Sequence, residues 1–161
     1  MINILAIIQI LIFIWYILYI KKNYGILSSI SESWYKLKEK NKQALFNVFA
    51  SGVGIPMMFY GLLDTISFNS TILFALSGLF LWVVSTASDY KQKMANKVHY
   101  VGATLSIICG FIGIIIQFNS WWPLIGFILS AVVLKRIKIK NYTWWVEILA
   151  FGFIITRLII I

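Results

Sequence analysis

Residues 85–103, STASDYKQKMANKVHYVGA, bring ionisable side chains close to long apolar runs. They include Asp89 and His99, the only histidine of the chain, with three lysines between them. With a serine such as Ser29 or Ser31, these two residues could form the Ser-His-Asp group of a hydrolase. The chain has no G-x-S-x-G nucleophile elbow, and these residue types occur in most chains of this length. Catalysis is therefore kept as an alternative, and we assign no catalytic residue.

Asp89 closes one apolar run and His99 opens the next, so a short turn between antiparallel helices would bring them together. The preferred interpretation is a hydrogen-bonded pair that clamps the two helices, and a polar ligand site at this face comes next. Glu147 lies about one helical turn into the last apolar run. There it could pair with a loop lysine or with His99. The candidate ligand-binding residues are Ser29, Ser31, Glu32, Asp89, His99 and Glu147.

No metal site or cofactor is expected. Zinc sites use three or four Cys, His, Asp or Glu ligands. The only cysteine, Cys109, lies ten residues beyond His99, on the order of 15 Å along a helix. Nucleotide binding would need a glycine-rich phosphate loop, and the chain has none.

The composition predicts a membrane protein. Of the 161 residues, 61% are hydrophobic and 12% are charged, with a mean hydropathy of +0.90, whereas soluble domains carry about 25% charged residues. The net charge of +9 comes from basic residues in short gaps between apolar runs. The positive-inside rule accounts for this placement. Nucleic-acid binding is therefore not expected, because no separate basic domain could carry it.

We predict an all-α polytopic bundle, a single domain of residues 1–161, because six apolar runs approach the length that crosses a bilayer. The expected spans are 2–20, 44–63, 71–88, 98–118, 121–134 and 143–161. The fifth is short: either it starts within QFNSWW (residues 117–122), or it relies on Lys135 and Arg136 reaching the interface with their long side chains. A five-span alternative would fuse the fourth and fifth runs into a re-entrant hairpin.

The basic residues predict the orientation. Thirteen of the fourteen Lys and Arg residues fall in the gaps 21–43, 89–97 and 135–142, and only Arg157 falls on the other side. The positive-inside rule then places these gaps in the cytoplasm and both termini outside. We expect a multi-pass protein of the bacterial cytoplasmic membrane, with membrane lipids as its partners.

The first basic gap predicts a short amphipathic helix. Ser29 and Glu32 fit the S-x-x-E capping box. Ile30, Trp34 and Leu37 then recur at helical spacing, with lysines on the other side. We expect this helix to lie on the inner leaflet, where its lysines would meet anionic lipid heads.

Gly102, Ser106 and Gly110 recur every four residues in the fourth run and form a stripe of small residues. Such a stripe lets another helix backbone approach closely. Packing within the chain is the preferred interpretation, and a homo-oligomer through this stripe is the alternative.

Three short elements occur in order: SIS (Ser29–Ser31), the pair Asp89-Tyr90, and VHYVGA (Val98–Ala103). With the number of apolar runs, they resemble small six-helix membrane proteins of unknown function from bacteria, archaea and phages. More distantly, they are similar to the FRAG/DRAM-type membrane family. The resemblance covers roughly residue 26 to the last span. It implies a six-helix bundle whose marked residues cluster at one membrane face, and it implies no reaction.

The leading functional hypothesis is non-enzymatic: a lipid or small-ligand site, or a partner-docking surface, at the cytoplasmic face. One alternative is a lipid-directed enzyme that uses His99 and Asp89. Another is a small channel or carrier, which would need a polar path along Asn47, Ser51, Ser77, Thr104, Ser106 and Gln117.

Overall fold

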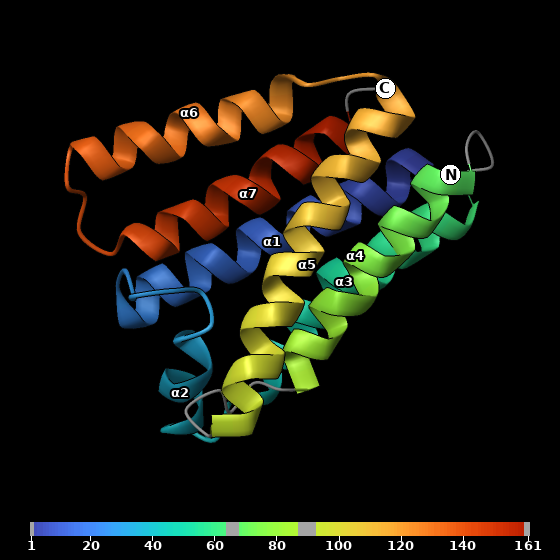
Figure 1. The fold of residues 1–161 in the computed structure, drawn as a ribbon. Coiled ribbons are helices and arrows are strands. Elements are labelled where there is room, and N and C mark those ends of the chain that lie inside the picture. Colours follow the sequence, from blue (N-terminus) through green and yellow to red (C-terminus); the bar gives the residue numbers. More distant parts are fainter. Residues whose placement is uncertain (1, 64–67, 87–92, 160–161) are drawn as a thin grey trace.

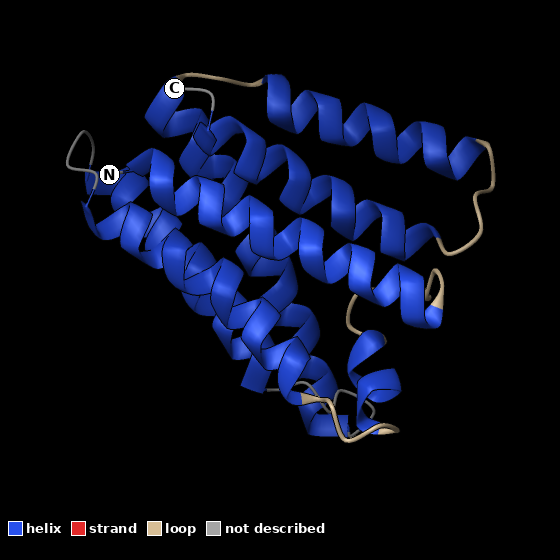
Figure 2. Ribbon diagram, turned by 180° about the vertical axis from the view of Figure 1, so that it is seen from behind, coloured by secondary structure: helices blue, strands red, loops and turns tan. Residues whose placement is uncertain are grey.

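The computed structural model describes residues 2–63, 68–86 and 93–159, which form helices and, within these ranges, no strand (Figures 1 and 2). This confirms the all-α class. The helices are α1 (Ile2–Tyr24), α2 (Ser33–Lys38), α3 (Ala44–Leu63), α4 (Phe68–Thr86), α5 (Lys93–Phe118), α6 (Trp122–Arg136) and α7 (Tyr142–Ile159). Each predicted span corresponds to one of them, and α2 lies in the first basic gap.

Five helices, α1, α3, α4, α5 and α7, are long and apolar enough to cross a membrane. The sixth candidate, α6, has only 15 residues, a length of about 22 Å at 1.5 Å per residue. It packs along α7 (Figure 1), and its Phe127 stacks on Phe111 of α5 with ring centroids 5.2 Å apart. The described structure therefore shows five spanning candidates and a shorter helix beside the last of them.

Residues suited to helix ends mark several helix boundaries. Gly25 follows α1 with a φ of 80°, a left-handed conformation that glycine adopts without steric cost. Asn119 follows α5 with a φ of 46°, and asparagine is among the few other residues that tolerate this region. Pro123 lies in the first turn of α6, where its missing N–H removes no helical hydrogen bond.

The long helices form two groups by direction (Figure 1). In one, α3, α4 and α5 pack in order; in the other, α1, α6 and α7 run in a similar direction, and α1 and α6 both contact α7. The groups are joined because α1 packs more extensively on α3 than on α7, and because α5 also contacts α7. The groups lie close at the end that holds both termini and diverge toward the opposite end, where α2 lies (Figure 1). We call this opposite end, formed by residues 21–43, 137–141 and the start of α5, the basic end.

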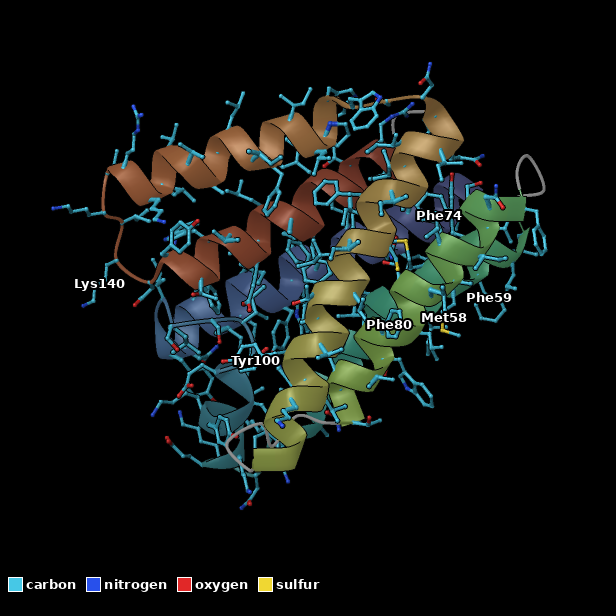
Figure 3. The ribbon with its side chains drawn as sticks, viewed as in Figure 1. Met58, Phe59, Phe74, Phe80, Tyr100 and Lys140 are labelled. Carbon is cyan, nitrogen blue, oxygen red and sulfur yellow. The ribbon has the colours of Figure 1, made fainter. Side chains whose placement is uncertain are left out.

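The charges follow this arrangement. Eleven described basic residues lie in the basic end or in the last turns of α1 and α6 beside it, and Arg157 lies near the termini. Lys140 marks the outer edge of this end in Figure 3. The eleven are Lys21, Lys22, Lys36, Lys38, Lys40, Lys42, Lys97, Lys135, Arg136, Lys138 and Lys140.

Glycines let α3 and α4 approach to backbone contact. A Cβ atom built on Gly78 would lie 2.3 Å from the carbonyl oxygen of Gly54, and one on Gly54 would lie 2.8 Å from that of Gly78. Gly61 meets the backbone of Thr71 in the same way, at 2.5 Å. Close approach through small residues is how helices associate where lipid removes the hydrophobic driving force.

The stripe of small residues on α5 packs within the chain. Gly102 faces the backbone of Phe80 on α4, and Gly110 fits against Ile154 on α7. Between them, the Ser106 hydroxyl donates to the Ser77 carbonyl at 2.8 Å, and the Ser77 hydroxyl donates to the Ser106 carbonyl at 2.8 Å. Within one chain, the stripe therefore packs against α4 and α7. A homo-oligomer through the stripe remains a prediction.

The short helix expected in the first basic gap is present as α2, but its apolar side is buried against protein. Trp34 and Leu37 of α2 and the preceding Ile30 are buried in a cluster with Phe46 and Phe49 of α3. The apolar side of α2 therefore covers protein, not the inner leaflet. The periodicity predicts that this side avoids water, but protein and lipid satisfy that requirement equally. The described lysines lie on the open side, where Lys38 sits over the Trp34 ring at 4.7 Å.

Candidate functional site

The segment between α1 and α2 is hydrogen-bonded to the start of α7 and to Asn141, the residue before it. The Trp144 N–H donates to the Ser28 carbonyl at 3.2 Å. The Asn141 side chain donates to the Ile26 carbonyl at 2.7 Å. Asn141 has a φ of 60°, which asparagine tolerates better than most residues. These contacts fix the backbone just before the SIS element.

The first part of the SIS element organises the turn that enters α2. The Ser29 hydroxyl accepts the Glu32 N–H at 3.1 Å, but α2 begins at Ser33 with Glu32 as its N-cap and without a side-chain cap bond, so Ser29 orders the preceding turn and the predicted capping box does not start the helix. The Ile30 N–H donates to Oε2 of Glu147 at 2.5 Å. Glu147 was expected to pair with a lysine or with His99, and among the described residues its partner is instead this backbone group. Residues 117 positions apart in sequence are thereby joined.

Ser31 joins this turn to α5. Its hydroxyl oxygen lies 2.7 Å from Nε2 of His99, and the two groups share a hydrogen bond. His99 is 2% exposed. Because Ser31 belongs to the entry to α2 and His99 to the first turns of α5, this bond links the turn to one helix group, as Glu147 links it to the other.

Tyr16 and Ser33, which are not among the predicted site residues, stabilise this turn by hydrogen bonds. The Ser33 hydroxyl donates to the Ile30 carbonyl at 2.5 Å, and the Tyr16 hydroxyl in turn donates to Ser33 at 2.5 Å. Both side chains are fully buried. Tyr16 also stacks on Phe49, with ring centroids 4.1 Å apart. A tyrosine well inside an apolar run was the available signal, since a buried hydroxyl needs a partner.

A cavity of about 170 Å³ lies beside this turn, bordered by α3, α4, α5 and α7. Ser31 and Glu147 line it together with the hydroxyl-bearing residues Tyr100, Thr104 and Thr143. The other lining residues are Ile30, Phe46, Phe49, Ala50, Leu81, Val84, Ala103, Ile107 and Phe151. Apolar walls with a few convergent polar groups are characteristic of ligand sites, but sites for drug-sized ligands measure about 300–1,000 Å³, so this chamber suits a small polar group and not a whole ligand.

Spacing could have pointed to part of this lining. Tyr100 and Thr104 lie four residues apart, as do Thr143, Glu147 and Phe151 in turn, so each set shares one helix face. The two faces oppose each other across one cavity because of how the helix groups pack. Local sequence patterns do not predict that packing.

A larger hollow of about 330 Å³ lies between α1, α6 and α7. Its lining is apolar apart from Thr156 and the indole of Trp122. Such a surface accepts any hydrocarbon chain but holds no group that would orient a specific ligand. We therefore place the candidate site at the smaller cavity, where the polar groups converge.

The six predicted site residues are placed as follows. Ser31 and Glu147 line the cavity, His99 contacts Ser31, and Ser29 and Glu32 form the turn beside it. Asp89, and with it the expected pair of Asp89 and His99, lies outside the described residues. In the described part of the chain, no three His, Cys, Asp or Glu side chains form a group that could hold a metal ion.

Fold and site together define a class: an all-helical protein with five helices long and apolar enough to cross a membrane and a small polar-lined cavity toward its basic end. Comparison with protein-family models, curated proteins and solved structures gives no match.

Proposed function

We propose that the chain is a multi-pass protein of a bacterial cytoplasmic membrane, with six spans and its basic end in the cytoplasm. The distribution of Lys and Arg supports this orientation. The shorter α6 qualifies as the sixth span because Trp121 and Trp122 stand at one end of it and Lys135 and Arg136 at the other. Such residues are typical of the two membrane interfaces.

Cysteine accessibility tests this topology. Cys109 is buried, so a Cys109→Ala background leaves one introduced thiol to be labelled in whole cells. Lys40→Cys and Lys140→Cys should be protected from an impermeant maleimide, and Ser120→Cys should react. Labelling of Ser120 and Lys140 positions from the same side would remove α6 from the spans, and labelling of Lys40→Cys would reverse the orientation.

For function, we propose that the cavity binds an amphiphile from the inner leaflet, without enzyme chemistry. The observation that carries this proposal is a chamber lined by both apolar side chains and convergent polar groups. Its lining residues Tyr100, Thr104 and Thr143 are exposed, so its mouth lies between α5 and α7, where lipid would surround them. An amphiphile could enter sideways and place its polar group against Ser31 and Glu147.

Filling the cavity tests this function. Ala103→Phe would project a ring into the chamber, and Ile108→Phe places the same ring on an exposed position of the same helix. Protein extracted in a mild detergent should retain bound lipid in native mass spectra, and Ala103→Phe should lose it while Ile108→Phe keeps it. Equal retention in both variants would contradict a ligand in this cavity.

The basic loops support a second role of the same face. The exposed Lys38, the last residue of α2, and Lys40, which follows the helix, are placed to meet anionic lipid heads or an acidic partner, each contributing about 1 kcal/mol at a charged membrane surface. Docking of this kind would hold the basic end at the inner leaflet, and it requires no change in the cavity.

The 2.7 Å contact of Ser31 with His99 favours one alternative, a serine hydrolase acting on lipid. Hydrolases of this type also need free N–H groups to stabilise the oxyanion. The neighbouring Ile30 N–H is bonded to Glu147, and the Glu32 N–H is bonded to Ser29. A fluorophosphonate probe separates the two functions, because a hydrolase would be labelled at Ser31 and a binding protein would not.

The channel or carrier alternative receives less support. Among the residues proposed to line a path, Ser77 and Ser106 bond to each other's helix, and Gln117 bonds to Ser70. These polar groups join α4 to α5. The resemblance to six-helix bacterial, archaeal and phage membrane proteins also stays a prediction.

A further inference from the structure

The cavity contains one formally charged side chain among the described residues that line it, the carboxylate of Glu147. One carboxylate oxygen, Oε2, accepts the Ile30 N–H. A carboxylate offers two oxygens with about four acceptor positions, so most of its capacity is left for a ligand. No ion pair of Glu147 occurs within residues 2–63, 68–86 and 93–159.

The rest of the lining suits a cation better than an anion. Rings of Phe46, Phe49 and Phe151 line the cavity, and Tyr100 lies at its mouth. Aromatic faces attract ammonium groups. Neither lysine nor arginine is among the described lining residues, so a phosphate or carboxylate ligand would meet a negative charge without a positive partner.

The chamber is also open to a molecule that is partly embedded in lipid. Tyr100 is 55% exposed and projects from the α5 face toward the other helix group (Figure 3). The lining residues Thr104 of α5 and Thr143 of α7 are exposed as well, so the chamber opens between these two helices. A ligand with an apolar chain could keep that chain in the bilayer while its head reaches Glu147.

We propose that this cavity recognises the ammonium group of an amine-bearing amphiphile, with Glu147 as its counter-ion and the surrounding rings as its walls. The inference rests on the proposed binding function and adds the chemical class of the ligand. The amine can come from a lipid headgroup, as in phosphatidylethanolamine, or from a free long-chain amine. Burial of a carboxylate is costly unless it is paired, and the ammonium group supplies that pairing.

The test uses the full chain in an uncharged maltoside detergent, with dodecylamine and dodecanol as probes of equal chain length. Glu147→Gln keeps an oxygen for the Ile30 N–H and removes the charge. Glu39→Gln is the matched control, because Glu39 is an exposed carboxylate that pairs with Lys36. Affinities follow from ligand-induced shifts of the unfolding temperature.

Wild-type protein and Glu39→Gln should bind dodecylamine at least tenfold more tightly than dodecanol. Glu147→Gln should lose that preference and keep its affinity for dodecanol. A wild-type preference that persists in Glu147→Gln would overturn the ammonium assignment and leave the binding function standing. If wild-type protein binds neither dodecylamine nor dodecanol, the binding function itself is overturned. If Glu147→Gln does not fold, equal wild-type affinities for the two probes overturn the assignment and a tenfold difference supports it.

Two further arms identify the source of the amine. Native mass spectra compare retention of phosphatidylethanolamine and phosphatidylglycerol by wild-type protein and Glu147→Gln. A preference for phosphatidylethanolamine that depends on Glu147 assigns the lipid headgroup. Preference for dodecylamine without preference between the two lipids assigns a free amine.

Discussion

Ser31 and His99 lie 68 positions apart in the chain, yet the Ser31 hydroxyl oxygen and His99 Nε2 are 2.7 Å apart. The contact joins the turn before α2 to the first turns of α5. On the opposite side, the same turn is joined to α7 through the Ile30 N–H and Glu147. One short segment thus connects the two helix groups where they diverge.

Replacing His99 with alanine should destabilise the protein by about 1–3 kcal/mol, because it removes a buried partner of Ser31. The measurement is thermal unfolding in detergent, with Val98→Ala as a control at an exposed neighbouring position. A hydrolase would behave differently, losing ester hydrolysis at an unchanged unfolding temperature. That outcome would replace the binding function with the enzyme alternative.

Two glycines should respond in opposite ways to alanine. Gly78→Ala would place a methyl group 2.3 Å from the Gly54 carbonyl oxygen, against backbone that is not free to move. We expect α3 and α4 to separate and the protein to lose more than about 2 kcal/mol, in the range of overpacked cores. Gly152→Ala meets no atom within 4 Å and should be neutral or stabilising by up to about 1 kcal/mol. Unfolding temperatures that rank the two variants the other way would contradict the described packing.

Leu37→Ala tests where the apolar side of α2 is buried. Leu37 is fully buried against the bundle, so its truncation should cost about 2–5 kcal/mol. Ile137→Ala, at a residue that is 63% exposed, is the control and should cost little. If α2 lay on the inner leaflet instead, Leu37→Ala would change membrane association and leave the unfolding temperature of the bundle near that of the control.

The reciprocal bonds of Ser77 and Ser106 allow a double-mutant cycle. Each single alanine variant removes one side chain–backbone bond and should cost about 0.5–1.5 kcal/mol. The double variant should cost less than the sum of the two, because α4 and α5 can re-pack once neither hydroxyl is present. Strict additivity of the unfolding free energies would indicate that the two bonds act independently.

The helices could be predicted well from the sequence, because each apolar run of suitable length must satisfy its backbone internally. Ser31, His99 and Glu147 could be selected from residue type and position. The bond of Glu147 to Ile30 could not be predicted, since a backbone N–H carries no mark in the sequence. The apolar side of α2 was expected on lipid, because amphipathicity shows that a surface is buried and not what covers it. A tyrosine within an apolar run signals that its hydroxyl needs a partner, but the pairing of Tyr16 with Ser33 was missed because only the fold brings the two together.

The bond between Ile30 and Glu147 has a consequence for mutational tolerance. Its donor is main chain, so every side chain at position 30 except proline retains it. Glu147 is different, because its oxygen is the acceptor and few residues could replace it. A scan of all substitutions should therefore find that polar changes at position 30 fail only through lost burial, whereas proline also breaks the link between the helix groups. At position 147, only glutamate and glutamine should keep that link.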